Sequence, residues 1–153
     1  MALLINDIVT EVSKCLEDMV TTSDTGSPMS FHESDSSAEE DDSAEDRAFW
    51  IAPTALGSRN VTGASGRVDR FFSFDVRVRY VNEGRNSSGI VGIIYQDASR
   101  IQDRVPFHLR TVAGVGECIE SGPARIDNDY VEPSLFHLVV PFTVEFIDDL
   151  VTA

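Results

Sequence analysis

Apolar residues near the N-terminus recur at the spacing of an α-helix. Between positions 5 and 20 they form one stripe at intervals of three and four residues, made of Ile5, Ile8, Val9, Val12, Cys15, Leu16 and Met19. A stripe of this kind buries one face of a helix against a core. Asn6 can cap the first turn, and Asp7 suits the positive end of the helix dipole. The pattern therefore predicts an amphipathic helix over residues 5–20.

Strict alternation of apolar and polar residues predicts two long strands. From Arg70 to Val81, one face has Phe72, Phe74, Val76, Val78 and Tyr80, and the other has Ser73, Asp75, Arg77 and Arg79. From Leu135 to Phe146, one face has Phe136, Leu138, Val140, Phe142, Val144 and Phe146. Side chains alternate across a strand, so each segment can bury one face. Pro141 lies on the opposite face of the later segment and favours an edge strand or a bulge.

Weaker patterns fill the gaps between these elements. Residues 48–53 are typical of a first strand, and a connection rich in Gly, Ser and Asn follows at 57–66. Residues 87–105 have helical spacing, and Pro106 is expected to end or kink that helix. Two short strands are predicted at about 112–120 and 123–127.

The predicted order is helix, strand, strand, helix, two short strands and a long strand. Two amphipathic helices against one face of a mainly antiparallel sheet form a two-layer α+β domain. The 153 residues fit a single domain spanning 1–153, and 42% hydrophobic residues suffice for a core.

Residues 21–46 differ sharply from the rest in composition. Between Asp24 and Asp46 there are no Lys or Arg residues but nine carboxylates: Asp24, Glu33, Asp35, Glu39, Glu40, Asp41, Asp42, Glu45 and Asp46. Like charges at this density oppose compaction, which predicts a long, mobile, low-complexity acidic loop after the first helix. The formal net charge of the chain is -14, so these nine carboxylates leave only about -5 for the remainder.

Several classes of function are disfavoured by the composition. A net negative chain repels nucleic-acid phosphates and anionic membranes, and no apolar run is long enough for a membrane span. Cys15 and Cys118 are too few for a disulfide framework, and we expect both to be buried, reduced thiols. His32, His108 and His137 have no metal-ligand spacing. We therefore expect no catalytic residues, no metal and no cofactor, and a small enzyme is the least favoured reading.

Arginines on the strand from Arg70 to Val81 are the candidate contact residues. Arginine is favoured at protein interfaces because its guanidinium pairs with carboxylates and stacks on flat groups. In a self-assembling ring, a row of arginines can meet an acidic patch on the next subunit. The candidates for a subunit or partner interface are Arg67, Arg70, Asp75, Arg77 and Arg79, with Arg85 nearby. The alternative is a solvated outer sheet face on which Asp75 is the partner of the arginines.

Four parts of the chain support a family resemblance. They are the N-terminal amphipathic helix, the strand from Phe72 to Tyr80, the helix containing Asp97-Ala-Ser-Arg-Ile101, and the terminal strand from Leu138 to Phe146 with Asp148. In these parts and in their order, the chain resembles a tail terminator (tail completion) protein of a long-tailed bacteriophage. The resemblance covers nearly all of the chain outside residues 21–46. The long acidic insertion departs from the short connection usual in that family.

The resemblance implies a non-enzymatic virion assembly protein that forms a homo-oligomeric ring, expected to be a hexamer. Such a ring docks on the tail tube protein, ends tube polymerisation and offers its other face to the head connector or neck protein. DNA passes through the lumen without specific binding. The implied location is the tail–neck junction of the virion, after assembly in the host cytoplasm. Two alternatives stay open: a head-side neck or stopper protein, and a regulatory binder that uses residues 24–46 as a DNA mimic.

Overall fold

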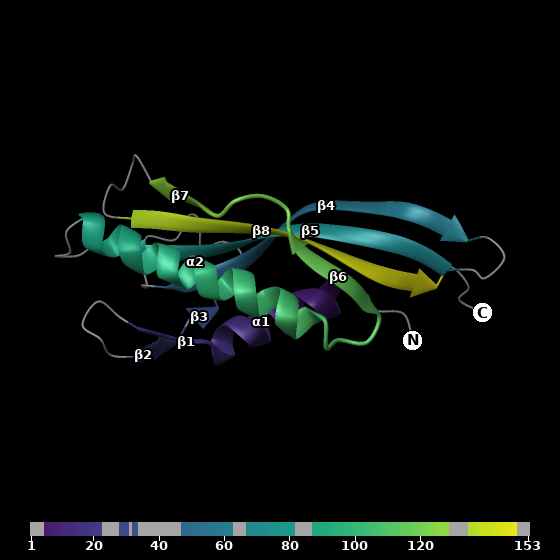
Figure 1. Cartoon of the computed structure of the whole chain (residues 1–153), viewed down its shortest axis with the longest axis horizontal. Helices are drawn as coiled ribbons and strands as arrows, with labels where there is room; N and C mark the ends of the chain where they lie inside the picture. Colours follow the sequence, from purple (N-terminus) through teal and green to yellow (C-terminus); the bar gives the residue numbers. More distant parts are fainter. Residues whose placement is uncertain are drawn as a thin grey trace.

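The computed structural model describes residues 5–22, 28–30, 32–33, 47–62, 67–81, 87–128 and 135–149. Two helices, α1 (Ile5–Asp18) and α2 (Ser87–Leu109), pack against one face of a sheet (Figure 1). The long strands of that sheet are β4 (Ala48–Thr62), β5 (Arg67–Val81) and β8 (Leu135–Asp149), and its shorter strands are β3 (His32–Glu33), β6 (Val115–Glu120) and β7 (Arg125–Asn128). Strands β1 (Val20–Thr22) and β2 (Pro28–Ser30) form a separate pair. The protein is a two-layer α+β domain, as the sequence predicts.

The main sheet has the strand order β3-β4-β5-β8-β6, and β7 also pairs with β8. All of its pairs are antiparallel except the short parallel pairing of β3 with β4. Strands β6 and β7 follow one another along the same side of β8, so β4 and β6 lie toward opposite edges (Figure 1). Within the described residues, β3 covers β4 only at Ala48 and Phe49.

The core lies between the two helices and the inward face of the sheet. The alternating residues of β5 and β8 are all buried there, which confirms the inward faces predicted for both strands. The apolar stripe of α1 packs on them through Ile8, Val12 and Leu16. Among the residues of α2, Ile101 and Leu109 are also fully buried. Hydrophobic burial on this one face therefore fixes the position of both helices.

Strand β8 is a central strand and its register with β5 is regular through Pro141, so the edge strand or bulge predicted from Pro141 is wrong. In an antiparallel ladder the N–H and C=O of one residue point toward the same neighbour. The Pro141 carbonyl accepts a hydrogen bond from the Ser121 N–H at 3.1 Å, so the missing N–H of the proline points to that side as well. There β6 has ended at Glu120 and β7 begins only at Arg125. Proline is tolerated because the neighbouring edge is interrupted beside it.

Two other boundaries differ from the sequence prediction. Strand β4 continues to Thr62, through most of the predicted connection at 57–66, with irregular register between Pro53 and Ala55 and between Ser58 and Asn60. Helix α2 continues past Pro106 to Leu109, so the helix does not end at the proline. Burial of Val105 and Leu109 on either side of Pro106 outweighs one lost backbone hydrogen bond.

The first part of the predicted acidic loop contains secondary structure. Strands β1, β2 and β3 occupy residues between 20 and 33, which corrects the prediction of a loop throughout 21–46. Only Asp24 and Glu33 of the nine carboxylates fall in this part, so charge repulsion there is weak. Residues 34–46, which contain the other seven, lie outside the described residues, as does the mobility predicted for them.

Candidate functional site

The predicted interface arginines do not form one row along β5. Asp75, Arg77 and Arg79 share the outward face of the strand, whereas Arg70 has the parity of the buried residues on the inward face. Nη1 of Arg70 donates a hydrogen bond to Oγ of Ser58 on β4 at 3.3 Å. Arg67 is the first residue of β5, ten positions from Arg77, or roughly 33 Å along an extended strand. The arginines therefore divide into two groups at opposite ends of β5.

The outward face around Arg79 is packed and not solvated. Arg79 is only 2% exposed, and its guanidinium carbon lies 5.8 Å from the ring centre of Trp50. The Trp50 ring in turn meets the ring of His137 edge-on, with ring centres 5.8 Å apart. Cation–π contact and burial hold Arg79 within the domain. In this conformation Arg79 is not available to a partner, whereas Arg77 is partly exposed.

A buried charged cluster connects β4, β5 and α2. Nε of Arg47 lies 2.9 Å from Oδ2 of Asp97, and the Tyr80 hydroxyl donates to the same oxygen at 2.7 Å. Burial raises the pKa of Asp97, and the hydrogen bonds from Tyr80 and Arg47 oppose that shift. Arg47 adopts a φ of 59°, and its N–H bonds the carbonyl of Arg79. The arrangement fixes the start of β4 and has a structural role.

Sequence reasoning missed this cluster, although one signal was present. Asp97 lies three residues after Ile94 and four before Ile101, so a carboxylate interrupts the apolar stripe of α2. A buried carboxylate requires a partner, because an unpaired buried charge is very costly. Arg47 is the first cation after the acidic residues, but nothing in the sequence pairs it with a residue fifty positions away.

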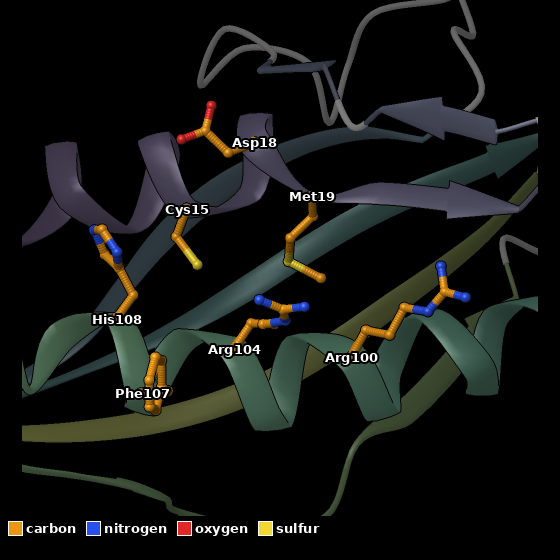
Figure 2. Close-up of a pocket in the computed structure, with 7 residues that line it drawn as sticks. All are labelled: Cys15, Asp18, Met19, Arg100, Arg104, Phe107 and His108. Carbon is orange, nitrogen blue, oxygen red and sulfur yellow. The ribbon is translucent and has the colours of Figure 1, made fainter.

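A groove of about 630 Å³ runs between the two helices (Figure 2). It is lined by Cys15, Asp18 and Met19 from α1 and the residue after it, and by Arg100, Arg104, Phe107 and His108 from α2. In Figure 2, Arg100 and Arg104 follow one another along α2, so the wall of the groove on this helix contains two cations. This wall is suited to contact with carboxylates.

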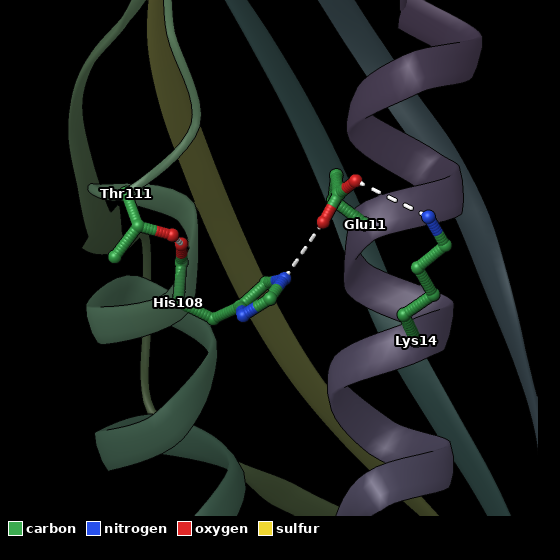
Figure 3. A network of polar contacts seen from close by, with 4 residues as sticks. All are labelled: Glu11, Lys14, His108 and Thr111. Carbon is green, nitrogen blue, oxygen red and sulfur yellow. Dashed lines mark hydrogen bonds and ion pairs between the residues drawn. The ribbon is translucent and has the colours of Figure 1, made fainter.

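The groove contains a cysteine and a histidine, the residue types of a thiol nucleophile and its base. Burial, however, raises the pKa of Cys15 to about 11, so the thiol stays protonated at neutral pH. His108 is engaged elsewhere, because its Nε2 donates to Oε2 of Glu11 at 2.9 Å (Figure 3). Lys14 contacts the other Glu11 oxygen at 3.5 Å. The network joins the two helices and does not activate the thiol.

Three of the exposed apolar side chains lie toward opposite edges of the sheet. Leu56 on β4 is 54% exposed, Ile119 on β6 is 49% exposed and Phe107 on α2 is 67% exposed. Phe107 and Ile119 belong to a second groove, of about 380 Å³, between α2 and β6. Asp103, Arg110 and Glu120 also line this groove. Exposed large apolar residues beside a groove are typical of protein contact surfaces.

Over the described ranges, no group of three or more His, Cys, Asp or Glu side chains is placed to hold a metal ion. Neither described helix is long and apolar enough to cross a membrane. Cys15 and Cys118 are both free and buried, as predicted. No protein-family model matches the chain, and no curated protein is similar to it at a significant level. The functional proposal therefore depends on the fold and the surfaces of the chain itself.

Proposed function

We propose that the chain is a non-enzymatic assembly protein that forms a ring, expected to be hexameric, at the end of a phage tail tube. The observation that supports this most is the exposure of large apolar side chains toward both edges of one sheet. Leu56 lies on β4, and Ile119 lies on β6 with Phe107 beside it. A protein with different contact surfaces on opposite sides can bind copies of itself head to tail, and such contacts close into a ring when the rotation fits.

The order of the elements also supports the proposal. The resemblance to tail terminator proteins depends on four parts in order: the N-terminal helix, the strand from Phe72 to Tyr80, the helix containing Asp97 to Ile101, and the terminal strand from Leu138 to Phe146. The fold has these parts in this order as α1, β5, α2 and β8, with β4 before β5 and with β6 and β7 before β8. The departure is the insertion between α1 and β4, which adds three short strands and the acidic residues 34–46.

In this function the two faces of the ring bind different partners. One face docks on the last ring of the tail tube protein and ends polymerisation, and the other provides the attachment surface for the head connector or neck protein. DNA passes through the lumen, and a net charge of -14 per chain disfavours retention of its phosphates. The site of action is the tail–neck junction of the virion.

Electron microscopy of negatively stained samples tests this function directly. The full chain would be added to polymerising tail tube protein, and the tubes would be imaged and measured. We expect a ring at one end of each tube and a tube length that stops increasing once the chain is present. Tubes that lengthen at an unchanged rate and show bare ends would refute the proposal.

The same preparations separate the remaining alternatives. Copurification with filled heads that lack tails, in place of tubes that lack heads, would identify a head-side neck or stopper protein. A variant without residues 34–46 should still form rings if the chain is a terminator. If that variant assembles normally but no longer binds a basic partner protein, the acidic residues have the role of a DNA mimic.

A further inference from the structure

We propose that Leu56 of one copy docks in the groove between α2 and β6 of the next copy. The contact joins the β4 edge of one sheet to the β6 edge of its neighbour. This inference rests on the proposed ring function and adds to it the two surfaces that meet. The occupant of the groove is thus a second copy of this chain.

The sheet register places the two surfaces at opposite ends of one row. Leu56 pairs with Phe72, Phe72 pairs with Val144, and Val144 pairs with Cys118. The two inner residues of the row are buried, and Cys118 lines the groove between α2 and β6. An exposed leucine thus stands at one end of the row and an open groove at the other. This is the geometry that a head-to-tail contact needs, because the two surfaces differ and lie toward opposite edges of the sheet.

The chemistry of the two surfaces is complementary. Residues 53–58 of β4 are uncharged, and Leu56 is their exposed large apolar side chain. In the groove, Pro106, Phe107 and Ile119 offer apolar surface. Docking of Leu56 there would remove apolar surface of both copies from water, which is the main favourable term in association.

The charges beside the two surfaces are also opposite in sign. Arg70 reaches toward the β4 edge, where it bonds Ser58, two residues from Leu56. At the rim of the groove, Asp103 and Glu120 outnumber the single cation Arg110. Complementary charges of this kind orient two partners and disfavour wrong registers. In this contact Arg70 meets an acidic patch on the next copy. The sequence suggested such a contact for the arginines of this strand.

Side-chain docking suits this edge better than the addition of a strand. Proline cannot donate to a ladder, and bulges interrupt the regular spacing of edge hydrogen bonds. Strand β4 has Pro53 and two register irregularities within the segment that flanks Leu56. A long continuous hydrogen-bond ladder between two copies is therefore disfavoured. Insertion of one side chain into a groove does not need such a ladder.

Two aspartate substitutions test the contact. Leu56→Asp damages one surface and leaves the groove intact, and Ile119→Asp damages the groove and leaves Leu56 intact. Both side chains are about half exposed, so each variant should fold, which circular dichroism would verify. Tyr95→Asp is the matched control, because Tyr95 is 51% exposed on α2 but lines neither groove. Assembly would be measured by sedimentation velocity and by ring counts on tail tubes.

Leu56→Asp or Ile119→Asp alone should raise the protein concentration needed for ring assembly by at least about tenfold. The control should leave that concentration unchanged. An equimolar mixture of Leu56→Asp and Ile119→Asp should form dimers but not rings, since each chain retains one intact surface. Contact of Leu56 with Leu56 would instead let Ile119→Asp form dimers on its own, because that variant retains Leu56. Arg70→Glu should also weaken assembly, and Arg70→Glu combined with Glu120→Arg in one chain should restore it.

The outcomes distinguish this contact from the ring function. If the wild-type chain forms rings and caps tubes, but both aspartate variants do so equally well, the contact is refuted and the function stands. If both variants fail but their mixture yields no dimer and the charge exchange restores nothing, the contact is again refuted. If the wild-type chain neither forms rings nor caps tubes, the proposed function and this contact fail together.

Discussion

Nε of Arg47 lies 2.9 Å from Oδ2 of Asp97, and both side chains are almost completely buried. The Tyr80 hydroxyl satisfies the same carboxylate oxygen, and the Arg47 guanidinium lies 6.0 Å from the Tyr80 ring centre. Because Arg47 directly precedes β4, this pair ties the beginning of a sheet strand to the middle of α2. A buried pair of this kind does not by itself imply high stability, but loss of one partner leaves an uncompensated charge.

Arg47→Met should therefore destabilise the domain strongly, by about 3–5 kcal/mol in urea unfolding. The reason is the buried Asp97 carboxylate, which would keep the Tyr80 hydrogen bond but lose its cation. Arg125→Met is the control, because Arg125 and Asp127 form a half-exposed pair at 3.7 Å and such pairs contribute at most about 1 kcal/mol. Equal losses for the two variants would contradict the importance of the buried pair.

The network between the helices predicts a pH dependence of stability. The pKa of Glu11 is lowered from 4.5, chiefly by the hydrogen bond from His108, with Lys14 adding a smaller effect (Figure 3). A lowered folded-state pKa gives stability that is complete above the unfolded value and is lost as the pH falls through the folded value. Because Glu11 is partly exposed, we expect this loss, below pH 4.5, to be less than about 1 kcal/mol.

Glu11→Gln isolates this effect. The raised pKa of Asp97 gives the opposite trend, since protonation of that buried carboxyl becomes more favourable in the folded state as the pH falls. Asp97 is present in both proteins, so its effect cancels in the difference between wild type and variant. That difference, from urea midpoints over a pH series, should shrink as the pH falls below 4.5. A difference that is constant over the series would exclude the proposed role of Glu11.

Both thiols should react slowly in the folded protein. Burial raises the pKa of Cys15 to about 11 and that of Cys118 to about 12, so the reactive thiolate is scarce at pH 8. With iodoacetamide and mass spectrometry, we expect alkylation of both to be much slower in buffer than in urea. Cys15 should react before Cys118, because it is 8% exposed and Cys118 only 1%. Rates that match those of the unfolded chain would show that the thiols are accessible.

The architecture followed from the sequence wherever one face of an element is buried against one core. Burial of one face produces the alternation in β5 and β8 and the apolar stripe in α1. For this reason the two-layer α+β fold could be predicted from the sequence. The edge position expected from Pro141 and the helix end expected at Pro106 were wrong, because tolerance of these prolines depends on the break between β6 and β7 and on the packing around Leu109. Sequence rules for a single helix or strand do not take account of the elements that pack beside it.

The candidate surfaces were only partly predictable for the same reason. The sequence grouped the strand arginines, but register and packing separated Arg70 at the β4 edge from Arg79, which is buried beside Trp50. The groove between α2 and β6 depends on which strands meet across the sheet, and so does the opposite position of Leu56. Long-range pairing of this kind is not visible in periodicity.

Gly57 lies where β4 passes under an aromatic ring of β5. A Cβ atom built at Gly57 would overlap the far end of the Phe71 ring, which covers the glycine on the neighbouring strand. Gly57→Ala should displace the far end of that partly exposed ring and cost about 0.5–1.5 kcal/mol in urea unfolding. In a Phe71→Ala background the same substitution should cost far less, because the overlapping atoms are absent.

Gly92→Ala is the matched control for the substitutions at positions 57 and 71. Gly92 lies on an exposed position of α2, and a Cβ atom there meets nothing within 4 Å. Alanine is the better helix former, so this substitution should stabilise the domain by about 0.5–1 kcal/mol. The coupling between positions 57 and 71 is the decisive quantity, since a simple change in backbone entropy would be the same in both backgrounds. A Gly57→Ala cost that does not change when Phe71 is removed would show that overlap with the ring is not its cause.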